Sequence, residues 1–475
     1  MGTKRKAYLI VPPTGLYIRE DRCQTPIKDL KTVALRPPID LMYAAASLDR
    51  GGCECTLTDF PAEGLGWNDL ERRLGDLAPD YLVLSITTPS LEEDLQAAKV
   101  AKRASPQTVV IAKGAHFNTL DVETLERHEN LDAVLRGEYE PACEAIGLGQ
   151  PLGEIAGVTW RNESGAIHRA ADADFVEDLD RLPFPARHLV RNDLYVRPDT
   201  GEPQTTLVTN RGCPYDCIFC LAPQVAGRTN RYRSVENVLE EVEECGNKFS
   251  IRNFLFRSDL FTQKRNWVIE LCRAIISRDL KIEWVCNSRV DTIDPEMLDW
   301  MKRAGCWLIA FGVESGDERM LNLMNKRADS AKAREAMQMT RRAGIRSSVY
   351  MLMGLPWENE QAIRDNIAFF RELDADFVEI FYVYPFPGTA LYELGVREGL
   401  LAPGEIPREA YGEPAMPTLH LSKAELAQWR RRALRKLLLR PRYVARTLLR
   451  PRSPREMFNY IRYGFVQLTD LLRRG

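Results

Sequence analysis

Three cysteines lie within one short stretch of the chain, Arg211-Gly-Cys-Pro-Tyr-Asp-Cys-Ile-Phe-Cys220. Their C-x3-C-x2-C spacing puts Cys213, Cys217 and Cys220 on a single loop. The apolar run at 205–209, just before this loop, predicts a buried β-strand. Because thiolates select soft metals, chiefly zinc and iron–sulfur centres, the stretch predicts a metal site at the carboxyl end of a strand.

Two metals compete for such a loop. A structural zinc site needs a fourth ligand at short range, and the nearest candidates are Cys245, beyond a predicted helix, and His188, before the strand. Neither continues a compact motif. Three thiolates on one loop instead favour a [4Fe–4S] cluster whose fourth iron is open to a ligand. Zinc and three simply buried cysteines remain the alternatives, and burial is the reading for the eight scattered cysteines.

The residues after the loop alternate between strand and helix patterns. Six strands are predicted near 205–209, 253–257, 282–286, 307–312, 346–353 and 377–383. Ser234 and the pair Asp294-Pro295 are N-terminal capping signals for two of the helices between them. Six βα units predict an open, partial (β/α)6 TIM-like barrel, because a closed eight-unit barrel needs more chain.

The residues before the loop predict a second α/β domain. Apolar runs at 7–11, 55–58, 81–86, 109–112 and 133–135 alternate with helical patterns such as 39–48 and 91–104. Buried strands separated by helices indicate a doubly wound (Rossmann-like) parallel sheet. Prolines and glycines then interrupt the pattern, which divides the chain into domain 1–150, linker 151–200, barrel 201–400 and a helical, basic C-terminal region 401–475.

Further motifs stand where the barrel strands are predicted to end. They are Arg231-Tyr-Arg-Ser234, Phe256-Arg-Ser-Asp-Leu-Phe-Thr262, Trp284-Val-Cys-Asn-Ser-Arg289, Phe311-Gly-Val-Glu-Ser-Gly316, Met353-Gly-Leu-Pro-Trp-Glu358 and Tyr384-Pro-Phe-Pro-Gly-Thr389. Together with the cysteine loop, residues 175–400 closely resemble the radical S-adenosylmethionine (AdoMet) superfamily.

This resemblance implies an enzyme in which a [4Fe–4S] cluster on Cys213, Cys217 and Cys220 cleaves AdoMet reductively to a 5′-deoxyadenosyl radical. It also implies a low-potential electron donor of the flavodoxin or ferredoxin type. AdoMet contacts are expected of Phe219, Ser258, Asp259, Ser288, Arg289 and Glu314. Arg289 would pair with the AdoMet carboxylate, and Glu314 would accept from the ribose. A purely structural ion pair between Arg289 and Glu314 is the alternative.

The first domain resembles the cobalamin-binding module that precedes the barrel in one radical AdoMet subclass. The matching motifs are Pro12-Pro13-Thr14, Ser85-Ile-Thr-Thr88, Lys113-Gly-Ala-His116 and Gly137-Glu-Tyr-Glu140. The cobalamin contacts that the resemblance implies are Thr14, Ser85, Thr87, Gly114, His116, Gly137 and Glu138. The D-x-H-x-x-G motif of a lower-face histidine is absent, and the glycines also fit tight βα turns.

With both cofactors, the resemblance implies methylation of an unactivated carbon of a small-molecule or lipid-like substrate. Relatives in the subclass perform cyclisation or oxidation instead, which is the main alternative. A tRNA methylthiotransferase would need three further N-terminal cysteines at strand ends, and Cys23, Cys53, Cys55 and Cys143 do not fit that pattern.

Charge is distributed unevenly along the chain. The net charge is −2, but residues 421–475 hold 15 Lys or Arg and three acids, a local +12, which leaves −14 on the first 420 residues. Two apolar stripes at helical spacing run through this basic region. They are Leu426, Trp429, Ala433, Leu437 and Phe458, Ile461, Phe465, Leu468, Leu472.

Three functions are open for this tail. It is either a helical cap packed over the barrel mouth or a membrane-surface contact, since basic amphipathic helices bind anionic lipid. Nucleic-acid binding is disfavoured because stacking aromatics are sparse. No apolar run approaches the ~18–20 residues of a membrane span, and the N-terminus lacks a signal-peptide core. A cytoplasmic enzyme, at most peripheral to the inner membrane face, is therefore expected.

Overall fold

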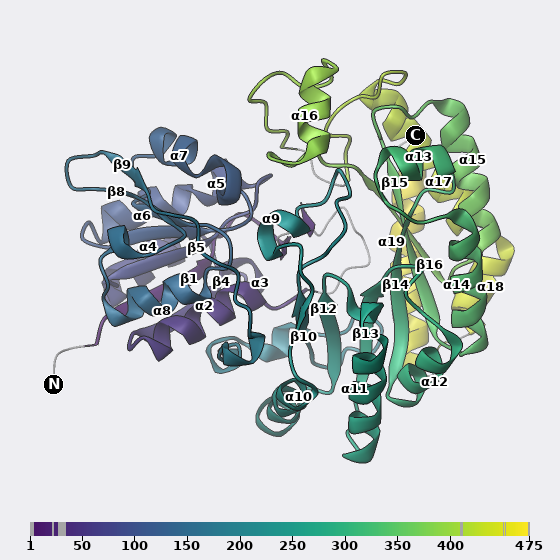
Figure 1. Ribbon diagram of the computed structural model, residues 1–475, viewed down its shortest axis with the longest axis horizontal. Helices are drawn as coiled ribbons and strands as arrows, with labels where there is room; N and C mark the ends of the chain where they lie inside the picture. Colours follow the sequence, from purple (N-terminus) through teal and green to yellow (C-terminus); the bar gives the residue numbers. More distant parts are fainter. Residues whose placement is uncertain are drawn as a thin grey trace. The chain divides into compact units, whose positions relative to one another are not determined.

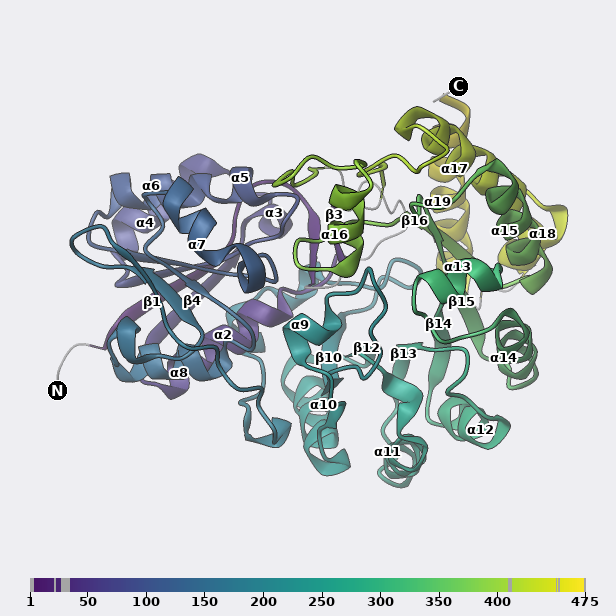
Figure 2. The same cartoon turned by 45° about the horizontal axis from the view of Figure 1, so that its top comes forward.

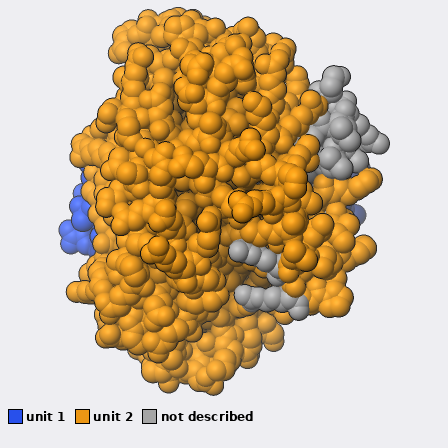
Figure 3. Space-filling view, turned by 90° about the vertical axis from the view of Figure 1, so that its right-hand side faces the viewer, with its two compact units in different colours: residues 1–27, 35–194, 221–231 blue, residues 28–34, 195–220, 232–475 orange. Residues whose placement is uncertain are grey.

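The computed structural model describes residues 4–20, 23–26, 35–408, 412–449, 451 and 453–473 (Figure 1). The chain forms two compact units, which Figure 3 colours separately. Unit 1 comprises residues 1–27, 35–194 and 221–231, and unit 2 comprises 28–34, 195–220 and 232–475. The segment directly after Cys220 therefore belongs to unit 1, although the cysteine loop itself belongs to unit 2.

Unit 1 is built on a seven-stranded sheet of order β4-β1-β5-β6-β7-β8-β9. The strands are β1 (Lys6–Val11), β4 (Glu54–Asp59), β5 (Tyr81–Ser85), β6 (Val109–Lys113), β7 (Ala133–Leu135), β8 (Val158–Arg161) and β9 (Ile167–Arg169). The first five pair in parallel, which confirms the predicted doubly wound sheet. Their apolar runs are buried because helices cover the sheet.

The helices of unit 1 lie between these strands in the chain. They are α2 (Ile39–Arg50), α3 (Phe60–Glu63), α4 (Trp67–Leu77), α5 (Leu91–Asp94), α6 (Gln96–Ala104), α7 (Phe117–Arg127), α8 (Glu140–Leu148) and α9 (Ala222–Ala226). A small antiparallel hairpin, β2 (Tyr17–Glu20) and β3 (Cys23–Pro26), follows β1.

Residues 151–200, expected to be a linker, contribute structure to unit 1. Strands β8 and β9 extend the sheet in antiparallel fashion beyond β7, and only short 3-10 turns follow them. Gly165, with φ +86°, lies in the turn between them. Three- and four-residue strands of mixed polarity carry too weak a period to be seen against the surrounding prolines and glycines.

Unit 2 is built on an open sheet of order β11-β10-β12-β13-β14-β15-β16. Its strands are β10 (Gln204–Arg211), β11 (Arg231–Tyr232), β12 (Asn253–Ser258), β13 (Glu283–Ser288), β14 (Cys306–Glu314), β15 (Arg346–Met353) and β16 (Phe377–Tyr382). All six predicted strands are present, and they pair in parallel in chain order. The predicted partial barrel is confirmed.

Helices cover the outer face of this sheet (Figure 2). They are α10 (Val235–Phe249), α11 (Arg265–Ser277), α12 (Pro295–Arg303), α14 (Ser330–Arg342) and α15 (Glu360–Leu373), with α13 (Glu318–Leu323) and α16 (Ala390–Arg397) at the carboxyl end. The predicted caps form: Ser234 accepts from Asn237 N, and Asp294 accepts from the first turn of α12. One apolar core joins helices and strands.

The C-terminal region is helical, as predicted: α17 (Lys423–Leu438), α18 (Pro441–Leu449) and α19 (Pro454–Arg473). The first apolar stripe buries α17 against α15 and β16. Arg430 donates to the carbonyl of Ile380, and Tyr382 donates to that of Leu426, so α17 covers the free edge of the sheet. No described helix is both long and apolar enough to cross a bilayer.

Glu358 fastens the loop after β15 and gives a pH-dependent prediction. Its buried carboxylate accepts from Gly354 N at 2.6 Å and Leu355 N at 3.3 Å. Burial raises the pKa of Glu358 from 4.5 to about 7, against the lowering effect of those two N–H groups. Between about pH 4.5 and 7 the folded chain therefore holds a proton that the unfolded chain has lost, so the free energy of unfolding falls by about 3 kcal/mol as pH rises through that window.

Urea unfolding of Glu358→Gln should lack this component of the pH dependence. Glu360→Gln, an exposed neighbour, should keep it. Identical profiles for Glu358→Gln and wild type between pH 4.5 and 7 would contradict the assignment.

Candidate cluster and cofactor site

The cysteine loop leaves the carboxyl end of β10 in unit 2. Gly212, with φ +95°, makes the turn out of the strand, and Cys213, Cys217 and Cys220 follow, all partly exposed. None of the ten described cysteine side chains forms a disulfide. The three predicted ligands thus share one accessible loop at the end of the sheet where α/β barrels build their active sites.

Backbone bonds attach this loop to the segment after α13 and to α16. Ile218 N donates to Met324 O at 3.1 Å, and Leu391 N donates to Ile218 O at 2.9 Å. Asp216 pairs with Arg327 at 3.2 Å. The loop is therefore held from two later parts of the barrel, and the residues between Met324 and Arg327 become neighbours of the cysteines.

A buried ion pair stands beside the loop. Glu314, at the end of β14, lies 3.0 Å from the ammonium of Lys326, and both side chains are about nine-tenths buried. Burial alone would lower the pKa of Lys326, but Glu314 and Cys217 raise it, and the net shift is upward. Lys326 is therefore a positive charge near the thiol of Cys217, one of the three predicted ligands.

The backbone around Glu314 is shaped to admit this pair. Glu314 has φ +68°, a left-handed conformation rarely adopted by a non-glycine residue, and β14 is irregular against β15 between Gly312 and Glu314. A Cβ on Gly312 would lie 2.7 Å from the Glu314 carboxylate and 3.0 Å from Lys326 Nζ. Gly312 and Glu314 of the Phe311–Gly316 motif therefore depend on each other: only a glycine at 312 leaves room for the ion pair between Glu314 and Lys326.

Arg289 has other partners than those expected for AdoMet. Its guanidinium makes two 2.8 Å bonds to Asp291 and donates to the carbonyls of Lys326 and Arg327. It also stacks 3.8 Å from the centre of the Tyr215 ring. Arg289 and Glu314 therefore take separate partners, and the ion pair between them considered as an alternative does not form.

Burial by itself would lower the pKa of Arg289, but Asp291 raises it, with a net upward shift. Arg289 thus ties the Tyr215 side of the cysteine loop to the Lys326 segment. It is a positioning residue in this arrangement.

The remaining predicted AdoMet residues lie around the same strand ends. Asp259 accepts from Gly212 N at 2.5 Å and so fixes the start of the cysteine loop. Ser288 belongs to a buried hydroxyl cluster with Thr262 and donates to its neighbour's carbonyl. Ser258 is buried at the end of β12. Phe219 packs against an apolar cluster at the ends of β15 and β16.

The donor set fits an iron–sulfur cluster. Three cysteine side chains that form no disulfide lie on one loop, and a cluster on thiolates carries negative charge that Lys326 and Arg289 would offset. Burial raises the pKa of Cys217 to about 11, while Lys326 and Arg289 lower it. Among the described residues no three Cys, His, Asp or Glu side chains already converge on one point, so binding would draw the thiols together.

In unit 1 a buried carboxylate organises the carboxyl edge of the sheet. Asp94 accepts from Thr14 Oγ1 at 2.6 Å, from Ser90 Oγ at 2.5 Å and from Arg19 at 2.6 and 2.9 Å. Arg19 also donates to the carbonyl of Ser85. Two predicted cobalamin residues, Thr14 and Ser85, are thereby joined at one point.

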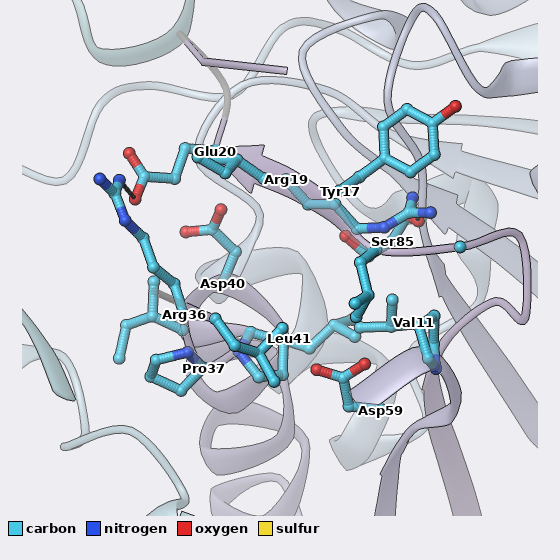
Figure 4. A pocket seen from close by; sticks show the side chains of 17 residues that line it. Val11, Tyr17, Arg19, Glu20, Arg36, Pro37, Asp40, Leu41, Asp59 and Ser85 are labelled. Carbon is cyan, nitrogen blue, oxygen red and sulfur yellow. Dashed lines mark hydrogen bonds and ion pairs between the residues drawn. The ribbon is translucent and has the colours of Figure 1, made fainter. Parts of the chain in front are cut away.

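Figure 4 shows the cavity beside this cluster, at the ends of β1, β4 and β5. Val11, Asp59 and Ser85 line it, and the pair Arg36–Glu20, at 2.7 Å, stands at one side. Its volume is about 40 Å³, enough for a few water molecules. A corrin ring is far larger, so it would have to lie along the edge and not inside this cavity.

Two predicted residues hold the loops of that edge in special conformations. Gly137 has φ +67°, donates from its N–H to Asn118 at 2.7 Å, and faces open space. Gly114 has φ +152°, and a Cβ there would lie 2.3 Å from the carbonyl oxygen of Ile86. These glycines permit left-handed and closely packed turns that other residues cannot adopt.

Gly114→Ala is expected to lower the stability of the full chain by about 2 kcal/mol or more, because both the backbone conformation and the contact with Ile86 become strained. Urea unfolding measures the change, and corrinoid retained after reconstitution should fall with it. Gly75→Ala on α4, where a Cβ meets nothing within 4 Å, is the matched control and should be neutral or stabilising. Equal stability of the two variants would contradict this reading.

His116 and Glu138 serve the interior of unit 1. His116 is buried with Nε2 3.2 Å from Thr124, and burial lowers its pKa to about 4. Glu138 receives two 2.9 Å bonds from Arg231 and one from Val176 N. Arg231 closes the segment that follows Cys220, so Glu138 anchors that segment to unit 1. Thr87 donates from its N–H to Asp94 at 3.4 Å and thus joins the Asp94 cluster.

Sequence reasoning missed Lys326, Asp94 and Arg19. Each lies in an unremarkable stretch of sequence, and each matters because folding brings it to a strand end. A buried acid such as Glu314 requires a counter-charge, which is the one available signal, but nothing along the chain says which cation supplies it.

Family comparisons agree with the geometry. Residues 207–370 match the radical SAM superfamily, and residues 31–147 match the B12 binding domain. The chain thus contains a radical SAM domain, and a B12-binding domain precedes it.

Relatives that match most of the chain include proteins named as a methyltransferase and as a cyclase. An uncharacterized methyltransferase of Pyrococcus horikoshii is 27% identical over 447 residues, covering 93% of this chain and 94% of the relative. The anaerobic magnesium-protoporphyrin IX monomethyl ester cyclase of Rubrivivax gelatinosus is 24% identical, covering 76% and 66%.

The fold has a solved counterpart in the radical S-adenosylmethionine methyltransferase TsrM from Kitasatospora setae, determined with tryptophan and a SAM analogue. The TM-score is 0.70 at 18% identity, and the match covers 92% of this chain and 90% of the other.

Proposed function

We propose that this chain is a cobalamin-dependent radical AdoMet methyltransferase that acts on an unactivated carbon of a small-molecule substrate. The observation that carries the proposal is a loop of three cysteines that form no disulfide, beside a buried Glu314–Lys326 pair, in a chain that also contains a B12-binding unit. When bound, the cluster supplies the electron that cleaves AdoMet, and cobalamin supplies the transferable methyl group.

The residues of unit 2 hold and orient these groups. Cys213, Cys217 and Cys220 bind the cluster, while Lys326 and Arg289 contribute the nearby positive charge. Glu314 is the carboxylate that would accept from the AdoMet ribose. Its bond to Lys326 and its backbone conformation at the end of β14 hold it in place. Phe219 offers an aromatic surface for the adenine, with Ser258 and Ser288 at the neighbouring strand ends.

In unit 1 the carboxyl edge offers the surface for the corrin. Thr14 and Thr87 bond Asp94, Ser85 accepts from Arg19 beside it, and Gly137 faces open space. His116 lies in the interior of this unit, where its Nε2 is 3.2 Å from Thr124 Oγ1.

Three partners complete the proposal. They are a low-potential flavodoxin- or ferredoxin-type donor, a small-molecule or lipid-like substrate, and a membrane surface that the basic C-terminal helices contact from the cytoplasm. A radical cyclase or oxidoreductase is the second candidate, and the similarity to a cyclase over 76% of the chain favours it next.

Anaerobic reconstitution of the full chain with iron, sulfide and cobalamin tests the assignment. The expected results are a bound iron–sulfur chromophore, a bound corrinoid and 5′-deoxyadenosine formed from AdoMet under reducing conditions. AdoMet that gives up its methyl group to the corrinoid becomes S-adenosylhomocysteine. Formation of S-adenosylhomocysteine therefore identifies the methyltransferase. 5′-Deoxyadenosine alone would favour the cyclase. The absence of both products would refute the radical reaction.

A further inference from the structure

Helix α19 contacts unit 2 through its polar side. Glu456 and Tyr460 both bond Arg346, the first residue of β15, at 3.5 and 2.7 Å. Asn459 donates to the carbonyl of Asp199 at 2.7 Å. These three residues, spaced i, i+3 and i+4, form one face of the helix, and that face is turned toward the barrel.

The apolar side of the same helix faces outward. Phe458 is 65% exposed, Ile461 52% and Phe465 65%. Their spacing of i, i+3 and i+7 places them on one stripe, about opposite the polar contacts at 3.6 residues per turn. The arrangement is the reverse of a helix that packs on a core in water.

Helix α18 shows the same reversal independently. Arg446 faces the barrel, where it bonds the carbonyl of Asp374 at 3.0 Å and lies 3.3 Å from the Asp376 carboxylate. Val444, Leu448 and Leu449 are exposed, Leu449 by 83%. Two consecutive helices thus bury charge and present apolar side chains, which a chance exposed residue does not explain.

Basic residues flank these apolar side chains. Arg442 on α18 and Arg462 on α19 are exposed, in a region whose local charge is +12. A surface that is apolar in the middle and cationic at its borders is complementary to a bilayer with anionic headgroups.

We propose that the outer faces of α18 and α19 form a docking surface for a bilayer that contains anionic phospholipid. The apolar side chains Val444, Leu448, Leu449, Phe458, Ile461 and Phe465 enter the headgroup boundary, and the arginines contact the phosphates. A second copy of the chain fits this surface less well, because a two-fold interface would bring the same positive charges together. A nucleic acid would leave the apolar stripe without a partner.

The docking surface lies away from the cysteine loop within unit 2. Arg346 begins β15 and Asp376 directly precedes β16, so α18 and the first turns of α19 lie at the amino ends of these strands. The cysteine loop follows the carboxyl end of β10. The bilayer therefore contacts unit 2 near the amino ends of these strands. The surface specifies the membrane contact proposed above and is independent of the radical chemistry.

Vesicle co-sedimentation of the full chain tests this surface without an activity assay. The probes are phosphatidylcholine vesicles and vesicles of phosphatidylcholine mixed with phosphatidylglycerol. The wild type should bind the anionic vesicles at least tenfold more strongly than the phosphatidylcholine vesicles. At about 1 M salt, where the Debye length is about 3 Å, much of the bound protein should be released. Phe458→Ser/Ile461→Ser/Phe465→Ser should bind at least tenfold less.

Single variants provide the matched control. Phe458→Ser should weaken binding several-fold, whereas Leu148→Ser, an equally exposed apolar residue of unit 1, should not. Light scattering reports the oligomeric state of each protein. Wild-type binding by the triple variant, absence of binding to anionic vesicles, or a wild-type dimer that the triple variant dissociates would each overturn the proposal.

Discussion

Replacing Cys213, Cys217 and Cys220 together by alanine is expected to abolish iron binding and AdoMet cleavage while the chain stays folded. The loop is partly exposed and attached through backbone bonds of Ile218, which the substitutions leave in place. Iron content should fall from about four atoms per chain to background, and 5′-deoxyadenosine should fall below detection.

Cys55→Ala is the matched control for this experiment. Cys55 is also partly exposed, but it lies in β4 of unit 1 and contacts the carbonyl of Ala45. It should keep both iron and AdoMet cleavage. Zinc in place of iron in the wild type, or full iron content in the triple alanine variant, would contradict the cluster assignment.

Lys326→Met is expected to lower both stability and AdoMet binding. The change leaves the Glu314 carboxylate buried without its cation, and breaking such a pair typically costs about 3–5 kcal/mol. Urea unfolding measures the loss, and equilibrium binding of AdoMet to the reconstituted protein should weaken at least tenfold. Lys332→Met breaks an exposed pair with Glu335 and should change the free energy of unfolding by less than about 1 kcal/mol.

A double variant separates the structural from the functional part of this effect. Glu314→Gln/Lys326→Met removes both charges and should regain most of the lost stability. AdoMet binding should stay weak, because the carboxylate for the ribose is gone. Recovery of AdoMet binding together with stability would show that the pair is structural only.

Most of the secondary structure was predictable because the chain repeats a strong local pattern. Buried parallel strands are continuous apolar runs, and the helices between them carry capping residues such as Ser234 and Asp294. The pattern failed at β8 and β9, where strands of four and three residues have no clear period. It also gave no sign that residues 221–231 fold with unit 1 through the pair Arg231–Glu138.

The site was predictable only where its residues are neighbours along the chain. The three cysteines share one loop, so their spacing predicted a metal site. The bonds of Arg289 to Asp291 and to two backbone carbonyls were not foreseen, and Lys326 was not expected at all. Pairing of charges depends on which loops meet at the carboxyl ends of the strands, and sequence distance carries no information about that.

The C-terminal helices show most clearly which features depend on local sequence and which depend on tertiary contacts. The sequence by itself determined that residues after 421 are helical, basic and striped with apolar side chains, because helical period and charge are local properties. It could not determine which side of each helix meets the barrel. A cap over the barrel mouth was one expectation, but α18 and the first turns of α19 contact residues at the amino ends of β15 and β16. Only the tertiary structure decided this, because the polar sides of these helices find partners in Arg346, Asp374 and Asp376, and their apolar stripes are left facing outward.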